Sequence, residues 1–272
     1  MTVQPDLDSY HALWIGESLP AYLAGCLASF LRLGHRVVLH SYEPVEGLPA
    51  GTETADAARV LPREKVFLHH RTRGLSAFSD HFRYRVLQDC GGTWIDTDIY
   101  LLRPISDPAP VLFAMNEPTV IGAGLLRLPP GHPLLCDLLG IFEHQPHRLP
   151  WLLPSTRRRA WLRRHLLRRP YYAVTPIGST GPGALTWLVK RHGLEERALP
   201  TAAICPVPWE EANGFARADF DVRPLLGPET LGIHLWNDVL RHRAEPPEPG
   251  SLMARIAEEG RGGAAALTLD GI

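Results

Sequence analysis

The sequence predicts an α/β fold with a mostly parallel central sheet. Three observations support this prediction. Segments with strand composition alternate with segments of helical spacing, glycines close the predicted helices, and 272 residues suffice for one large domain with a substantial core. A strand, a helix and a second strand within about 30 residues form the basic unit of a parallel sheet.

The first such unit lies near the N-terminus. A short strand is expected over residues 10–15, because the segment YHALWI is largely apolar. A helix is expected over residues 19–33, where apolar side chains recur at helical spacing, and Gly34 ends it. The β-branched segment 36–42 is expected to be the second strand.

The same criteria predict the later elements. Further strands are expected over residues 93–95, 111–115, 120–128 and 202–207, and further helices over 75–89, 132–142 and 183–192. From Glu245 the sequence becomes rich in proline, glycine and alanine, which is typical of weak order. We therefore expect one domain over residues 1–244 and a loosely ordered tail over 245–272.

Composition and charge limit the partners and the location. The formal net charge is −1, so no overall field attracts nucleic acid, and no nucleic-acid partner is expected. The four cysteines are widely spaced, which favours free thiols in a reducing compartment. The sequence shows no basic and apolar leader and no run of about 18 apolar residues. A cytoplasmic location is the resulting expectation.

Two carboxylates follow the predicted strand 93–95. Asp96 and Asp98 are two residues apart, so in an extended segment they would point to the same side. Like charges on one face repel each other, and a divalent cation such as Mg²⁺ or Mn²⁺, which prefers oxygen ligands, would relieve the repulsion. Ligands of open α/β sheets also bind beyond the carboxyl ends of strands. The alternative is a solvated turn whose aspartates cap backbone amides.

The residues around this pair favour the first interpretation. The segment SDHFRYRVLQDCGGTWIDTDIYLLRPI resembles the signature of glycosyltransferases with the DxD motif, of the family 32 type. These include capsular-polysaccharide, mannosyl- and galactosyltransferase homologues and are related to the core of clostridial glucosylating toxins. The matching residues are Ser79, Asp80, Arg83, Gly91, Gly92, Trp94, Asp96, Asp98 and Pro104.

Three further segments are similar to parts of this family: residues 13–44, TPIGSTGPGALTWLV and GIHLWND. The resemblance therefore extends over residues 10–240. It implies a GT-A type nucleotide-sugar-binding fold with helical embellishment. It also implies transfer of a sugar from a nucleotide-diphosphate donor with retention of the anomeric configuration.

The resemblance implies roles for four residues of the signature. Asp98 matches the direct metal ligand, and Asp96 matches its partner, which contacts ribose and sugar hydroxyls or the metal through water. Asp80 and Arg83 match helix residues that contact the donor sugar and phosphate. Their spacing of three places them on one helical face. Asp96, Asp98 and Arg83 are the expected catalytic residues.

His234 matches a position that completes the metal site in related enzymes, and Asn237 is the alternative. An imidazole ligand would favour Mn²⁺ over Mg²⁺. Trp14, with Gly16, matches a position near the nucleotide base, and Trp94 matches one that lines the donor pocket. Either tryptophan could instead belong to the core.

The segment Gly181-Pro182-Gly183 has two interpretations. It could simply start a helix, or its backbone amides, with Ser179, could face the donor diphosphate. We include Ser179 and Gly181 in the expected donor-binding set. Glu117 is the one carboxylate that we would test as the base of an inverting enzyme.

The sequence thus predicts a metal-dependent, retaining hexosyltransferase that acts in surface polysaccharide or glycoconjugate synthesis. The expected cofactor is Mn²⁺ or Mg²⁺, and the expected donor is a UDP-hexose or GDP-mannose. The acceptor would be a glycan, a lipid-linked molecule or a small molecule with a hydroxyl group. The alternatives are a metal-dependent nucleotide-sugar hydrolase and a non-catalytic binder of sugar nucleotides.

An arginine-rich insert over residues 151–172 stands apart from these motifs. It carries seven arginines between residues 157 and 169, and Trp161, Leu162, Leu166 and Leu167 could form an apolar stripe opposite them. Such helices bind anionic membranes or acidic polymers, which here would suggest peripheral membrane contact. The alternative is a solvated helix that covers the sheet.

Overall fold

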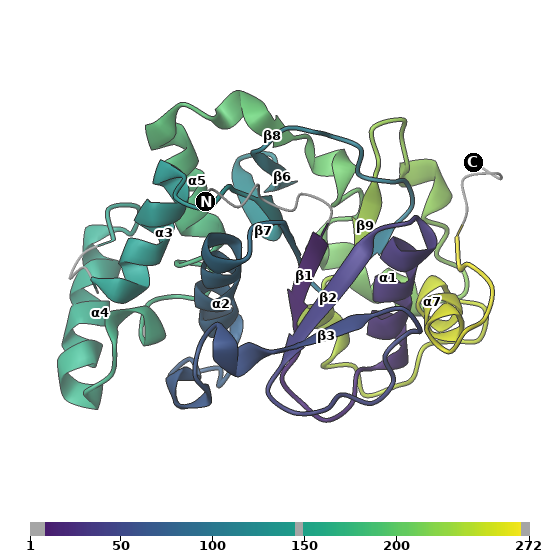
Figure 1. Ribbon diagram of the computed structural model, residues 1–272, viewed down its shortest axis with the longest axis horizontal. Helices are drawn as coiled ribbons and strands as arrows, with labels where there is room; N and C mark the ends of the chain where they lie inside the picture. Colours follow the sequence, from purple (N-terminus) through teal and green to yellow (C-terminus); the bar gives the residue numbers. More distant parts are fainter. Residues whose placement is uncertain (1–8, 145–148, 268–272) are drawn as a thin grey trace.

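The computed structural model describes residues 9–144 and 149–267, which form an α/β fold around a seven-stranded sheet (Figure 1). The strands are β1 Ser9–Leu13, β2 Arg36–Ser41, β3 Glu53–Asp56, β4 Thr93–Ile95, β5 Ile99–Leu101, β6 Leu112–Glu117, β7 Val120–Arg127, β8 Ala198–Leu199 and β9 Gly232–His234. The α-helices are α1 Ala21–Arg32, α2 Ser76–Asp89, α3 Pro133–Glu143, α4 Pro154–Leu167, α5 Pro182–His192, α6 Asn237–Leu240 and α7 Leu252–Gly260. None of the helices in the described part of the chain combines the length and the hydrophobicity of a transmembrane span.

The central sheet has the order β3-β2-β1-β4-β7-β6-β8. The pairs β2/β3, β1/β2, β1/β4 and β6/β8 are parallel, whereas β7 runs antiparallel to both β4 and β6. The predicted α/β class with a mostly parallel sheet is therefore confirmed. The carboxyl ends of β1, β2 and β4 lie at one edge, where the segment after β4 carries Asp96.

Helices cover both faces of the sheet. Successive residues of a strand point to opposite faces and therefore belong to different hydrophobic clusters. Trp94 packs with α2, α3 and α5 on one face, while Ile95 packs with α1 on the other. Leu125 and Leu126 of β7 divide in the same way. The position of Asp96 is thus fixed by a strand whose side chains are buried on both faces.

A second, two-stranded sheet pairs β5 with β9 in antiparallel register. Ile99 lies opposite His234, although 135 positions separate them in the sequence. This pairing brings His234 to the turn after β4. The backbone N–H of Leu235 also donates a hydrogen bond to the carbonyl of Asp98, at 2.8 Å.

Most predicted elements are confirmed to within two or three residues, but the strand expected over 202–207 is wrong. A 3-10 turn, Thr201–Ala203, lies there instead and leads into an irregular segment. Ile204, Cys205 and Val207 are nevertheless buried in the core. Their apolar composition reflects burial, which a short run shares with a strand.

The expectation of a loosely ordered tail is also wrong for the part that the structure describes. Helix α7 packs against α1, and its Ile256 is fully buried. The two helices approach so closely that a Cβ on Gly25 would lie 1.9 Å from the carbonyl oxygen of Ile256. A Cβ on Gly260 would lie 2.1 Å from the carbonyl oxygen of Ala21. Gly25 of α1 and Gly260 of α7 therefore permit tight packing between the two helices.

Candidate metal and donor site

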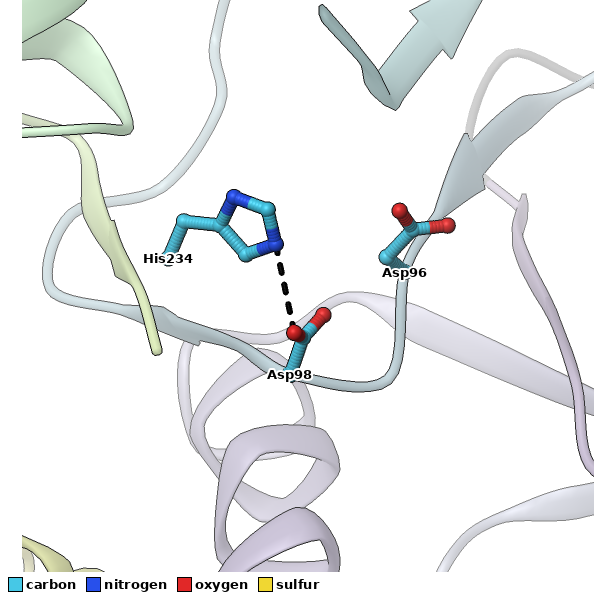
Figure 2. A group of neighbouring side chains, drawn as sticks. All are labelled: Asp96, Asp98 and His234. Carbon is cyan, nitrogen blue, oxygen red and sulfur yellow. Dashed lines mark ion pairs between the residues drawn. The ribbon is translucent and has the colours of Figure 1, made fainter. Parts of the chain in front are cut away.

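The two aspartates lie in the turn that connects β4 to β5. Asp96 directly follows β4, and Asp98 is the last residue before β5. The segment is therefore a turn, and the extended geometry that we expected is wrong. The turn still places the two carboxylates and His234 as neighbours (Figure 2). One ligand atom from each of these three residues lies within 4.8 Å of the other two.

The pairing of β5 with β9 places His234 at this turn. Its Nε2 lies 3.2 Å from Oδ2 of Asp98 (Figure 2). The same Oδ2 accepts a hydrogen bond of 2.7 Å from the backbone N–H of Asn237. The side-chain oxygen of Asn237 instead accepts a hydrogen bond from the Tyr22 hydroxyl. Of the two alternatives at this position, the imidazole of His234 joins the carboxylates.

Asp98 and His234 are both buried, and burial disfavours the charged form of each. Burial alone would raise the pKa of Asp98, but the charge and hydrogen bond of His234 lower it below its usual value. Burial alone would lower the pKa of His234, but the Asp98 carboxylate raises it well above its usual value. In the structure described, the two side chains therefore form an ion pair.

Asp96 is held by a different set of groups. Its Oδ1 accepts hydrogen bonds from Trp94 Nε1 at 2.8 Å and from Arg83 Nη2 at 3.1 Å. Its backbone N–H donates to the carbonyl of Gly124 at 2.7 Å. The Asp96 side chain remains 28% exposed, so it is reachable from solvent. Trp94 is a core residue whose indole N–H positions Asp96.

The guanidinium of Arg83 lies beneath Asp96. It is 7% exposed, and besides Asp96 it donates hydrogen bonds to the Ala123 carbonyl and to Ser79. Its guanidinium carbon also lies 5.2 Å from the centre of the Trp94 ring. These bonds use four of the five N–H donors of the guanidinium. Arg83 therefore holds Asp96 in place, and its contact with the donor phosphate stays a prediction.

Asp80 continues this buried network from the same face of α2. Its Oδ2 accepts a hydrogen bond of 2.7 Å from the Thr180 hydroxyl, and its Oδ1 lies 3.7 Å from Arg83 Nη2. Burial raises the pKa of Asp80, although Arg83 and Thr180 oppose the shift. Gly181 packs directly on this carboxylate, since a Cβ there would lie 2.6 Å from Oδ1 of Asp80. Asp80 thus links α2 to the loop before α5.

Three other predicted donor-site residues lie in two loops near this edge. Trp14 and Gly16 follow β1, and the indole N–H of Trp14 donates to the Ser18 carbonyl at 3.0 Å within the same loop. Ser179 is buried, and its carbonyl accepts a hydrogen bond of 2.8 Å from Trp151. Of the predicted set, the structure joins Asp80, Arg83, Trp94, Asp96 and Gly181 through contacts around Asp96 or Asp80.

Sequence patterns predicted no role for several groups that shape the site. The Cys205 thiol lies 3.7 Å from Nδ1 of His234, on the ring nitrogen that does not face Asp98. Tyr22 holds the side chain of Asn237. Gly124 had a usable signal, because glycine inside a strand often marks close backbone approach. A Cβ at Gly124 would lie 3.0 Å from Oδ2 of Asp96.

The donor set fits a divalent cation. Two carboxylates and one imidazole each place a ligand atom within 4.8 Å of the other two, and oxygen with nitrogen ligands suits a first-row divalent ion. Nε2 of His234 and Oδ2 of Asp98, which face each other across 3.2 Å, would be ligand atoms. A cation would therefore compete with the proton that they share, so we expect binding to release a proton.

Comparisons with known proteins assign the chain to no family. No family model matches it, and no curated protein matches it. The PaToxG glycosyltransferase structure has 12% identity, covers 70% of this chain and 71% of its own, and gives a TM-score of 0.44. The ligand-free glycosyltransferase domain of the YGT toxin has 9% identity, covers 76% of this chain and 85% of its own, and gives a TM-score of 0.42. At these values, function must be argued from the site.

Proposed function

We propose that this protein is a metal-dependent glycosyltransferase of GT-A type that moves a hexose from a nucleotide-diphosphate sugar to a hydroxyl acceptor. The observation that carries the proposal is the convergence of Asp96, Asp98 and His234 beyond the carboxyl end of β4. Ligands of open α/β sheets bind at such an edge. The match of residues 79–105 to the DxD signature supports the same conclusion.

The cation would be held by Asp98 and His234, with Asp96 as the third group. Imidazole beside carboxylates favours Mn²⁺ over Mg²⁺. When bound, such a cation supplies Lewis-acid stabilisation of the charge that develops on the leaving diphosphate. The protein's own contribution is to fix the ligands: Trp94 and Arg83 hold Asp96, and the backbone N–H of Asn237 holds Asp98.

Retention is the stereochemical outcome that we propose. The acceptor hydroxyl attacks the anomeric carbon from the side of the leaving group. The bond to the diphosphate oxygen breaks, the bond to the acceptor oxygen forms, and the departing oxygen takes the hydroxyl proton. This route needs no carboxylate base. Glu117, which an inverting route would use, is exposed at the turn between β6 and β7. The anomeric configuration of the product, measured by NMR, tests the assignment.

The central test is binding of Mn²⁺ and of nucleotide sugars to wild type and to Asp98→Asn, measured by calorimetry and thermal shift. A ligand at 100 times its Kd should stabilise the fold by about 2.7 kcal/mol. We expect Asp98→Asn to weaken Mn²⁺ binding by at least roughly 100-fold, above the 10- to 100-fold typical of lost supporting contacts. Asp221→Asn is the matched control, because Asp221 is an exposed carboxylate paired with Arg223.

Three results would contradict the proposal in different ways. Donor binding that does not depend on metal would mean that the site is misplaced. Release of nucleotide diphosphate at the full rate without any acceptor would indicate a nucleotide-sugar hydrolase. Metal-dependent donor binding without turnover across a panel of glycan, lipid-linked and small hydroxyl acceptors would indicate a non-catalytic binder.

A further inference from the structure

Helix α4 presents large apolar side chains to solvent. Within the described residues, eight large hydrophobic side chains are exposed, and five of them lie on this helix or just before it: Leu153, Trp161, Leu162, Leu166 and Leu167. Leu153 is 71% exposed and Leu166 is 73% exposed. Single exposed apolar residues are ordinary, but a concentrated group marks an interaction surface.

Trp161, Leu162 and Leu166 lie on the outer side of the helix, whereas Leu167, two turns after Ala160, lies nearer the inner side. Leu162 and Leu166 are one turn apart, as are Trp161 and His165, whose ring centres lie 4.4 Å apart. Ala160 is buried and faces the protein. Most of α4 is solvated, as in the alternative interpretation, but the helix does not lie over the sheet (Figure 1). The helix contacts the 3-10 turn Tyr171–Ala173 and lies at one end of the molecule, outside the sheet (Figure 1).

Positive charge surrounds this apolar group. Seven arginines lie between residues 157 and 169, and the sequence has no aspartate or glutamate from residue 144 to residue 194. Arg158 and Arg159 are exposed beside the apolar side chains. Since the whole chain has a net charge of −1, this positive charge is a local feature of one end of the molecule.

We propose that the outer side of α4 docks on an anionic lipid surface. Arginines attract anionic headgroups, while leucine and tryptophan side chains enter the boundary between headgroups and acyl chains. A nucleic acid or another acidic polymer would satisfy the arginines but leave Leu162 and Leu166 in water. The combination of both kinds of side chain on one exposed surface therefore favours a membrane.

The docking helix is fixed to the loop that supports the candidate site. Trp151, just before α4, donates a hydrogen bond to the Ser179 carbonyl. In the segment after α4, the Thr175 carbonyl lies 2.9 Å from a ring nitrogen of His69. This loop continues to Thr180, which bonds Asp80. Docking through α4 would thus hold the site at the membrane surface, whatever reaction the site performs.

Vesicle co-sedimentation of the full chain tests this surface. We expect binding to vesicles of phosphatidylcholine with phosphatidylserine and much weaker binding to phosphatidylcholine alone. Removing two arginines with Arg158→Gln and Arg159→Gln should lower partitioning about 25-fold, since each arginine near an anionic surface is worth about fivefold. Replacing Trp161 and Leu166 with alanine should lower it by about tenfold or more.

Matched variants separate this surface from general effects. Arg59→Gln with Arg261→Gln removes the same charge elsewhere, and Trp209→Ala with Leu225→Ala removes exposed apolar groups elsewhere. Both controls should bind vesicles like wild type. The proposal is overturned if wild type does not bind anionic vesicles. It is also overturned if only the arginine variant loses binding, because that result would indicate an acidic polymer as the partner. Self-association without vesicles that the Trp161 and Leu166 variant abolishes would indicate a second copy of the chain.

Discussion

The carboxylate turn and helix α4 use charge in opposite ways. Around the turn, charged groups lie inside the protein and are held by specific partners: Arg83 by Asp96, and Asp98 by His234. On α4, Arg158 and Arg159 extend into solvent beside exposed leucines. The same residue type, arginine, is thus part of the folded interior in one region and part of an outer surface in the other. The free energy of unfolding should respond to its removal accordingly.

The largest expected effect follows from removing Arg83. Arg83→Met would leave Asp80 and Asp96 without their cation, and Asp80 is buried. Removal of one partner from a buried ionic group costs on the order of 3–5 kcal/mol, because the remaining charge is uncompensated. Arg159→Met on α4 should change the free energy of unfolding by less than about 0.5 kcal/mol. Urea denaturation of both variants measures the difference.

Equal losses in the two variants would contradict the contrast between the regions. If Arg83→Met does not fold, Arg83→Lys provides the measurement. A lysine keeps the charge but cannot donate in the planar, forked pattern by which Arg83 reaches Ala123, Ser79 and Asp96. We expect its stability to lie between those of wild type and Arg83→Met.

The next effect concerns pH and the buried histidine of β2. The pKa of His40 is lowered to about 4 from an unfolded value of about 6.5. Burial is the larger cause and the nearby His11 is the smaller one. The folded state therefore binds fewer protons than the unfolded state between these values. The stability contribution of neutral His40 is complete above pH 6.5 and is lost as pH falls toward 4, by about 3 kcal/mol.

Urea denaturation at pH 7, 6 and 5 tests this window, with His40→Gln as the comparison. Glutamine does not titrate but can still bond Nδ1 of His11, which lies 3.0 Å from Nε2 of His40. We expect a shallower fall of stability in the variant. The remaining slope should include His81, whose pKa burial also lowers to about 4. An identical slope in the variant would show that His40 is not the group that titrates.

Local sequence patterns predicted most of the central sheet, because β1, β2 and β4 have strand composition and their helices have clear periodicity. The turn geometry at Asp98 and its partner His234 depend on β5 pairing with β9, which no local pattern encodes. The resemblance to a family suggested His234, and the structure brings it to the turn. Its role as a metal ligand stays a prediction.

The structure adds protein contacts to residues whose predicted role is donor binding. Arg83 and Asp80 contact Asp96, Thr180 and the backbone, and their contact with the donor stays a prediction. A motif identifies which residues matter but does not say whether a side chain faces the ligand or supports one that does. Trp94 illustrates the same limit, since it is both a core residue and a donor to Asp96.

The smallest expected effect tests whether distance or burial sets the value of an ion pair. Arg36 and Glu53 join β2 to β3 through two hydrogen bonds of 2.7 Å, shorter than the 3.1 Å between Arg83 and Asp96. Both partners are about half exposed, so water solvates each charge when the other is removed. We expect Glu53→Gln to leave the urea midpoint unchanged within error. A shift comparable to that of Arg83→Met would mean that contact geometry, and not burial, separates the two regions.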